Sequence, residues 1–465
     1  MNPLLKYSKE HLLPEQPIGS GYYYARFSQS EFVPTPETGE IFGIWFFEAF
    51  DGEWFDRHRT PETDELADYY DNAALFVLQA RVLPIHLRIF PAFAQVEKAA
   101  FEEEDSEEWF VFEAFPNEGR ILGEGELPLT IYSNLYQPGI EAAAKDFRPA
   151  DPTVAARLRK VVSTAHIPDA TEADVDNALA GVAAANIEWA VVYNVGQGNA
   201  IGLCNGNGSV VTYFDLGGGV LANAGTFPSS LTNFCFTQQS PIILSHWDFD
   251  HWSSASRDAN SLRRTWFAPK QTVGPTHVAL MTSIMTSGKL LLVPPGFTAK
   301  WRGQVYLERC TGKDRNHSGV ALTLSEQANG GGKQMLFPGD ARYTYIPSFP
   351  NPTTSHYLSV VVPHHGGDMR SRTMSLCPSL TASRLVYSYG TGNTFSHPRH
   401  ITRMDHQTAG WHDPYIFASP PHEVRETTSR GTGAFGHVLL GWKSHPKLPP
   451  LQCSGTSCQL QAQQL

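Results

Sequence analysis

Short apolar runs separated by polar turns dominate the second half of the chain. EWAVVYNV, AIGLC, SVVTYFDL and PIILSH follow one another from residue 188 to 246, and each ends in a Gly or a polar turn. Runs of this length, rich in β-branched and aromatic residues, are typical of strands. Three later runs, MLFPGDA (335–341), SVVVPHHGGD (359–368) and LVYSYGTGN (385–393), follow the same pattern. The pattern predicts a β-rich domain with strands that end in chemically reactive residues.

The first half has a different pattern, with more aromatic and acidic residues. Strands are predicted for GYYYARF (21–27), IFGIWFFEAF (41–50), LPIHLRIFPAF (83–93) and EEWFVFEAF (107–115). A helix is predicted for TPETDELADYYDNAALFVLQARV (60–82), which has helical apolar spacing after a Thr-Pro start. Two further helices are predicted within 145–188, in DPTVAARLRKVVSTA and in ATEADVDNALAGVAAAN, which begins with a Thr capping signal.

These changes of pattern predict four segments. Residues 1–145 form an acidic N-terminal domain, 146–187 a helical connector, 188–443 the β-rich domain, and 444–465 a disordered tail. The length of 465 residues fits two domains. With 41% apolar and 17% charged residues, the composition excludes a wholly disordered chain, a coiled coil and a collagen-like chain.

Net charge differs sharply between the two halves. The whole chain carries −11, but residues 1–180 contain 14 Lys and Arg against 32 Asp and Glu, which gives −18. Residues 181–465 contain 21 Lys and Arg against 14 Asp and Glu, which gives +7. The basic half is suited to an anionic substrate, and the acidic half to a protein partner.

No apolar run is long enough to span a membrane, and the N-terminus lacks the apolar core of a signal peptide. We therefore expect a cytoplasmic protein with no membrane partner.

The strongest chemical signal is SHWDFDH (245–251), which we call the metal motif. It places His246, Asp248, Asp250 and His251 within six residues, directly after the predicted strand PIIL. A turn at the end of a buried strand can direct all four side chains inward. Imidazole nitrogen and carboxylate oxygen are the ligand atoms of zinc-like sites.

Further candidate ligands stand at the ends of later strands. Asp340 ends MLFPGD, and a carboxylate there can bridge two metals. His364 and His365 end SVVVPHH, followed by two glycines that permit close approach of a substrate, and His397 follows the Gly/Asn-rich turn after LVYSY. His317, in DRNHSGVAL, is interpreted as a loop histidine, with a ligand role as the alternative.

Six motifs in order resemble the metallo-β-lactamase superfamily: NVGQG (194–198), FDLGG (214–218), HWDFDH, PGD, PHHG and SHP. Within that superfamily, the soluble hydrolase domain of the ComEC-type competence proteins is most similar, over residues 188–442. The resemblance implies an α/β fold, a four-layer αβ/βα sandwich, to which an acidic, aromatic-rich α+β domain is added at the N-terminus. The chain has no membrane channel like that of the competence proteins, so a role in DNA uptake does not follow.

The resemblance also implies roles for the candidate residues. Two divalent metals are expected, zinc first, with manganese or iron as alternatives because Asp248 stands where much of the superfamily has His. The implied roles are as follows: His246 and Asp248 hold one metal, Asp250 and His251 the second, Asp340 bridges both, His364 and His397 complete the two shells, and Asp215 orients the site from behind.

A metal-bridged hydroxide would then attack the substrate, with Asp250 orienting it and His365 donating a proton or binding a substrate oxygen. Either His364 or His365 can be the ligand; His364 is the first choice because it ends the strand. The predicted activity is that of a phosphodiesterase or nuclease, acting on a phosphodiester or other anionic substrate such as nucleic acid. The alternatives are a lactonase, thioesterase or phosphorylcholine esterase, or a hydrolase regulated by its N-terminal half as a sensor or binding module.

Overall fold

The structure, a computed structural model, describes most of the chain. The described ranges are 20–34, 41–83, 106–117, 119–349, 357–369, 383–411, 422–428 and 436–442. They divide into two compact units. The barrel unit contains the described residues up to Pro168 together with Thr272–Thr286, and the two-sheet unit contains Asp169–Gln271 and the described residues from Ser287 on. The predicted tail 444–465 and nearly all of LPIHLRIFPAF lie outside the described residues.

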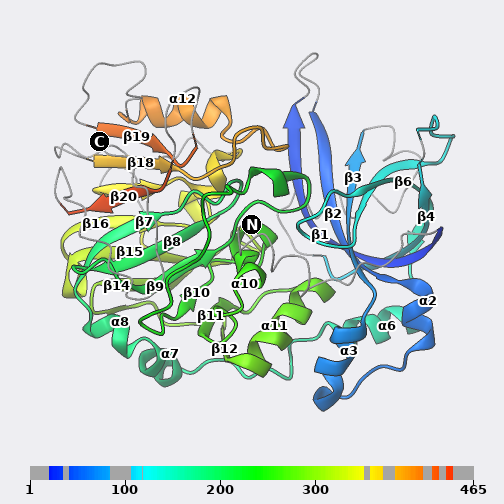
Figure 1. The fold of residues 1–465 in the computed structure, drawn as a ribbon, viewed down its shortest axis with the longest axis horizontal. Coiled ribbons are helices and arrows are strands. Elements are labelled where there is room, and N and C mark those ends of the chain that lie inside the picture. Colours follow the sequence, from blue (N-terminus) through cyan, green and yellow to red (C-terminus); the bar gives the residue numbers. More distant parts are fainter. Residues whose placement is uncertain are drawn as a thin grey trace. The chain divides into compact units, whose positions relative to one another are not determined.

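Six strands of the N-terminal half close into an antiparallel barrel, in the order β1-β2-β3-β5-β6-β4 (Figure 1). The strands are β1 (Gly21–Pro34), β2 (Ile41–Asp51), β3 (Leu75–Val82), β4 (Trp109–Pro116), β5 (Leu127–Tyr132) and β6 (Ile140–Pro149). Alternate residues such as Trp45, Phe47 and Ala49 of β2 fill one apolar core. Closure leaves no strand edge of the barrel unpaired.

Short helices accompany the barrel. They are α2 (Gly52–Arg57), η1 (Thr63–Glu65), α3 (Leu66–Asn72), α6 (Pro152–Val161) and α11 (Pro275–Ser287). The predicted helix over 60–82 is wrong beyond Asn72, because Leu75–Val82 pairs with both β2 and β5 as strand β3. Pairing within the barrel overrides the helical spacing of this segment.

Helix α11 brings a second segment of the chain into the barrel unit. The carboxylate of Glu48, on β2, accepts the backbone N–H of Thr276 at 2.9 Å. Its other oxygen lies 2.7 Å from Nδ1 of His277, and both side chains are buried. Glu48 therefore satisfies an N–H in the first turn of α11 and places a negative charge at that end of the helix.

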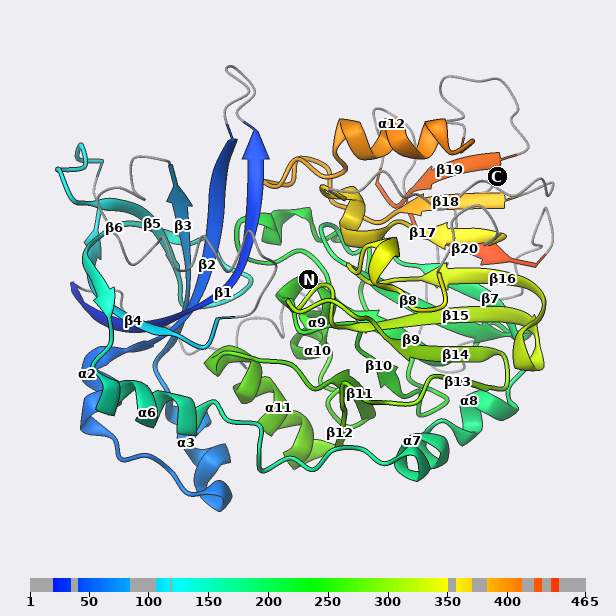
Figure 2. The same cartoon turned by 180° about the vertical axis from the view of Figure 1, so that it is seen from behind.

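The two-sheet unit contains two sheets of seven strands (Figures 1 and 2). The first has the order β12-β11-β10-β9-β8-β7-β20. Its strands are β7 (Ile187–Val192), β8 (Ala200–Asn205), β9 (Val210–Leu216), β10 (Ile242–Ile243), β11 (Thr265–Pro269), β12 (Lys289–Val293) and β20 (Val438–Gly441). Strands β9 to β12 are parallel, and β9, β8, β7 and β20 are antiparallel neighbours.

The second sheet follows the chain order from β13 to β19. Its strands are β13 (Lys300–Arg302), β14 (Val305–Arg309), β15 (Val320–Gln327), β16 (Gly331–Phe337), β17 (Ser359–Val361), β18 (Ser383–Tyr387) and β19 (His422–Glu426). Strands β13 to β16 are antiparallel, and β16 to β19 are parallel. Buried residues of both sheets form one core, in which Phe214 and Phe337 lie 6.4 Å apart by ring centroids. The two sheets therefore pack face to face.

The predicted α/β fold class, a four-layer αβ/βα sandwich with an added α+β domain, is wrong. The described chain is mostly β and forms three sheets, one of them the closed barrel. The described helices of the two-sheet unit span only four to nine residues: α7 (Glu172–Ala178), α8 (Ala180–Ala184), α9 (Phe249–Trp252), α10 (Ser254–Arg257) and α12 (His400–Thr408). Half of each sheet is antiparallel, and antiparallel strands need only tight turns rather than crossover helices.

The division into units falls within the predicted connector 146–187. Helix α6 belongs to the barrel unit, and α7 and α8 belong to the two-sheet unit. None of the helices in the described part of the chain has both the length and the apolar character needed to cross a bilayer.

Candidate metal centre

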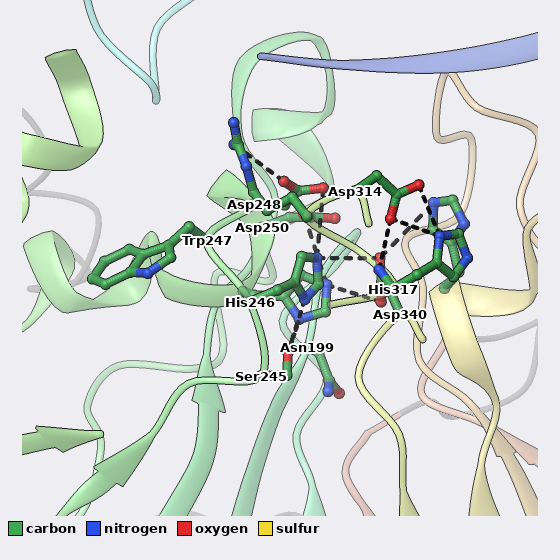
Figure 3. Close-up of polar contacts among 12 residues, drawn as sticks. Asn199, Ser245, His246, Trp247, Asp248, Asp250, Asp314, His317 and Asp340 are labelled. Atoms are coloured by element: carbon green, nitrogen blue, oxygen red, sulfur yellow. Dashed lines mark hydrogen bonds and ion pairs between the residues drawn. The ribbon is translucent and has the colours of Figure 1, made fainter. Parts of the chain in front are cut away.

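The metal motif follows β10 and enters α9, so that the chain turns sharply after a buried strand. Aromatic residues within the motif and directly after it fix this turn. Trp247 donates its indole N–H to the carbonyl of Pro269 at 2.8 Å, and Trp252 donates to the carbonyl of Trp247 at 3.0 Å. Trp247 points away from His246 and the aspartates (Figure 3). With the aromatic side chains packed in the core, the polar ones face the site.

One cluster contains His246, Asp248 and Asp340. Nε2 of His246 lies 3.5 Å from Oδ2 of Asp248 and 3.7 Å from Oδ2 of Asp340. Arg315, from the turn between β14 and β15, places a guanidinium nitrogen 3.3 Å from the other oxygen of Asp248. Asp248 is therefore held from one side by a cation and faces His246 with its second oxygen.

A second cluster contains Asp250, His251 and His365. Nε2 of His365 lies 3.3 Å from Oδ2 of Asp250 and 3.2 Å from Nε2 of His251. Nε2 of His251 lies 3.9 Å from Oδ1 of Asp250. The three ligand atoms lie close enough together for one ion to bind all of them.

Asp340 joins the two clusters. Its Oδ1 lies 3.1 Å from Nε2 of His251 and 3.8 Å from Nε2 of His365. Its Oδ2 lies 3.7 Å from Nε2 of His246 and 3.8 Å from Nε2 of His364. Each oxygen of one carboxylate thus faces a different pair of histidines, which is the arrangement of a carboxylate that bridges two ions.

His364 and His397 lie beside this centre. Their rings are 5.1 Å apart by centroids, and the ring of His397 lies 6.4 Å from that of His365. Where the sequence left the choice open between His364 and His365, the structure places His365 in the cluster with Asp250 and His251. The side chains of His364 and Asp250 are each 15% exposed, so these two face the open side of the site.

A buried hydrogen-bond network supports the clusters from behind. Asp215, at the end of β9, accepts the backbone N–H of Ser245 at 2.7 Å, the side-chain N–H of Asn199 at 3.0 Å and the Ser245 hydroxyl at 2.9 Å. Nδ1 of His251 lies 2.8 Å from the same carboxylate. The network therefore fixes the ring of His251 with Nε2 directed into the site, as expected from the predicted orienting role of Asp215.

The backbone carbonyl of Ser388 orients the ring of His365 in a similar way. It lies 2.7 Å from Nδ1 of His365, and the Ser388 hydroxyl donates to the carbonyl of Gly198 at 2.9 Å. A carbonyl can only accept, so Nδ1 of His365 carries the proton and Nε2 is left with a lone pair. The NVGQG loop and the end of β18 together orient this residue.

Several residues at the site have left-handed backbone conformations. The φ angles are 60° at Asp215, 50° at His364 and 53° at His365. Such conformations cost non-glycine residues on the order of 1 kcal/mol each and occur where the surrounding structure holds a functional group in place. At His364 and His365 they direct two consecutive rings to different parts of the site.

The charges at the site interact strongly. Burial raises the pKa of Asp340, but His251, His365 and His364 oppose this effect and hold the pKa well below its usual range. Burial lowers the pKa of His251, but Asp340 and Asp215 outweigh it and raise that pKa well above the usual value. A metal ion would therefore compete with a proton for His251 and release that proton on binding, whereas the carboxylate of Asp340 is already ionised.

Within the described residues, two buried atoms of these clusters form no well-aligned hydrogen bond: Nε2 of His246 and Oδ1 of Asp340, although the latter lies 3.1 Å from Nε2 of His251. Buried polar atoms rarely lack a partner, because desolvation without a hydrogen bond is costly. Both atoms are of the kind that zinc, manganese and iron bind, and both point into the centre. The residues present therefore fit the two divalent cations predicted from the sequence.

Three contributors were not predicted from the sequence: Ser245, Arg315 and the carbonyl of Ser388. Ser245 stands inside the metal motif itself, directly before His246, and its position was the only local signal.

His317 is buried, and its Nδ1 lies 2.7 Å from Asp314. This carboxylate–imidazole pair is typical of a histidine whose ring orientation is fixed, for packing or for ligation.

Comparison of the chain with models of protein families and with curated proteins found no match.

Proposed function

We propose that the two-sheet unit is a binuclear metal-dependent hydrolase that cleaves phosphodiesters. The observation that carries this proposal is the position of Asp340, whose two oxygens face different histidine pairs. The ordered motifs that resemble the metallo-β-lactamase superfamily support it independently, and membership of that superfamily stays a prediction.

The proposed ligands divide into two groups. His246 and Asp248 would hold one cation, Asp250, His251 and His365 the other, and Asp340 both. Mixed imidazole and carboxylate ligands suit zinc, and manganese or iron would also bind. His364 and His397 then lie next to the ions rather than behind them, and they are suited to contact the substrate.

Two divalent cations at such a site activate water and stabilise negative charge in hydrolysis. The protein itself contributes position and charge. Asp250 reaches the open side of the site, where its carboxylate can accept a hydrogen bond from attacking water. His364, which is equally exposed, can donate a proton to the oxygen that leaves. Ser388 and Asp215 hold the rings of His365 and His251 so that their Nε2 atoms stay directed at the centre.

The choice of a phosphodiester rests on charge. Residues 181–465 carry +7 although they contain the acidic residues of the site, and a basic surface attracts polyanions. Carboxylic ester, lactone and thioester substrates use the same metal chemistry and differ only in the atom attacked, so they belong in the same substrate panel.

The test combines metal analysis with that panel. The full-length protein, loaded with Zn²⁺ or Mn²⁺, is assayed on DNA, RNA, a bis-aryl phosphodiester, a lactone and a thioester. We expect two metals per chain, cleavage of phosphodiesters, and a loss on the order of a hundredfold or more in Asp340→Asn. Asp169→Asn, which changes a half-exposed carboxylate of the same unit, is the matched control.

Fewer than one metal per chain, or an Asp340→Asn variant as active as the wild type, would overturn the proposal. Two metals per chain with activity on lactones or thioesters alone would overturn the phosphodiester assignment while retaining the metal centre.

A further inference from the structure

We propose that Ser245 is a positioning residue that fixes the ring of His246 and thereby sets the affinity of one of the two metal sites. This inference rests on the proposed function. Ser245 is 1% exposed and lies between the carboxylate of Asp215 and the rings of two histidines. Its hydroxyl is 2.9 Å from Oδ2 of Asp215, 2.9 Å from Nδ1 of His246 and 3.2 Å from Nδ1 of His251.

The direction of each hydrogen bond follows from what each group can donate. A carboxylate can only accept, so the single proton of the Ser245 hydroxyl goes to Asp215. The lone pairs of Ser245 are then available to accept from Nδ1–H of His246. With its proton on Nδ1, His246 has a lone pair on Nε2, the atom directed at Asp248 and Asp340.

The two histidines depend on Ser245 to different degrees. Nδ1 of His251 has its shorter contact with Asp215 itself, at 2.8 Å, and Ser245 is a second neighbour at 3.2 Å. Nδ1 of His246 contacts Ser245 at 2.9 Å. Loss of the hydroxyl should therefore affect His246 far more than His251.

Crowding around Ser245 leaves little room for water to replace the hydroxyl. Gly339 has a φ of 60°, and a Cβ at that position would lie 2.5 Å from Cβ of Ser245. The turn that follows β16 thus packs directly on the serine. In Ser245→Ala, Nδ1 of His246 would face a methyl group, which neither accepts its proton nor fixes the tautomer.

The experiment compares Zn²⁺ binding to full-length wild type, Ser245→Ala and Ser240→Ala by competition with a chromophoric chelator. Ser240 is the matched control, because it is also buried in the two-sheet unit but donates to the carbonyl of Val210 at 2.6 Å. We expect Ser245→Ala to bind one of two zinc ions about tenfold or more weakly, with little change in the other, and Ser240→Ala to match the wild type. Asp215→Asn should weaken both sites.

A second measurement needs no variant of Ser245. In the zinc-loaded protein labelled with ¹⁵N-histidine, the Nδ1–H of His246, assigned by its absence in His246→Gln, should exchange slowly with solvent because the buried hydroxyl of Ser245 accepts it. Rapid exchange would overturn the inference, as would equal zinc affinities in Ser245→Ala and wild type, or equal weakening in Ser245→Ala and Ser240→Ala. Wild-type protein that binds no zinc would instead overturn the proposed function, so the two failures are distinguishable.

Discussion

Acid should destabilise the two-sheet unit through His406, a buried histidine of α12. Its ring nitrogens contact the hydroxyls of Tyr387 at 3.0 Å and Tyr343 at 3.2 Å, and Nδ1 also lies 2.9 Å from the carbonyl of Thr402. Burial is the main cause that lowers the pKa of His406 from 6.5 to about 4; the neighbouring Arg403 lowers it further, and the Thr402 carbonyl opposes this.

The sign and size of the effect follow from proton linkage. Between pH 6.5 and 4 the unfolded chain binds the proton and the folded chain does not, so stability falls as the pH falls through this range. Lowering the pKa of His406 from 6.5 to about 4 corresponds to about 3 kcal/mol in total, of which about 2 kcal/mol is lost between pH 7 and pH 5. Above pH 6.5 the residue is neutral in both states and contributes no pH dependence.

The assay is denaturant unfolding of wild type and His406→Gln at pH 7 and pH 5, both without metal. Glutamine can hydrogen-bond to the tyrosines but does not titrate, so the variant should lose about 2 kcal/mol less than wild type over this interval. His400→Gln, which replaces an exposed histidine of the same helix, controls for the removal of an imidazole. Equal pH dependence in wild type and His406→Gln would refute the reasoning.

Three further predictions concern the metal centre and the barrel. His365→Gln should weaken metal binding by about tenfold or more, whereas His364→Gln should retain two metals and lose turnover. Metal analysis and steady-state kinetics of both variants check this, and the reverse pattern would assign His364 as the ligand. Gly217→Ala should lower the number of metal ions bound per chain, because its Cβ would lie 1.7 Å from a backbone carbonyl oxygen of the metal motif. Gly225→Ala, which adds a Cβ in open space, should match wild type in the same metal analysis. Glu48→Ala should destabilise the barrel unit by about 3 kcal/mol in denaturant unfolding, because it removes a buried carboxylate that lies 2.7 Å from Nδ1 of His277 and accepts an N–H of α11. A loss below about 1 kcal/mol would contradict this.

The sequence could predict that these polar residues lie close together, because they follow strands in short contiguous motifs. His246 and His251 belong to one turn, and Asp340 and His365 lie in the turns that follow β16 and β17, two adjacent parallel strands of the second sheet. Strand ends of packed sheets meet at the same edge, so local pattern alone indicated the cluster. The position of His365 beside Asp250 and His251 depends on the carbonyl of Ser388, directly after β18, and on two left-handed residues, which no local pattern reveals.

The fold was predicted less well. The strands over 21–27, 41–50 and 107–115 were predicted correctly, but closure of the barrel depends on pairings between distant strands. The sequence 75–82 has helical spacing and becomes a strand because β2 and β5 flank it. The four-layer sandwich was inferred from the resemblance and not from the chain's own pattern, which predicted short strands separated by turns.

Because the chain returns to the barrel unit at Thr272–Thr286, this unit is completed only late in synthesis on the ribosome. Thr272–Thr286 belong to the barrel unit, although about a hundred residues of the other unit precede them. At roughly 5–20 residues per second, Glu48 leaves the ribosome many seconds before the helix whose N-terminus it caps. Until then the carboxylate of Glu48 stays open to water and to chaperones. The N-terminal half of this protein therefore cannot complete its native packing as an independent, earlier folding step.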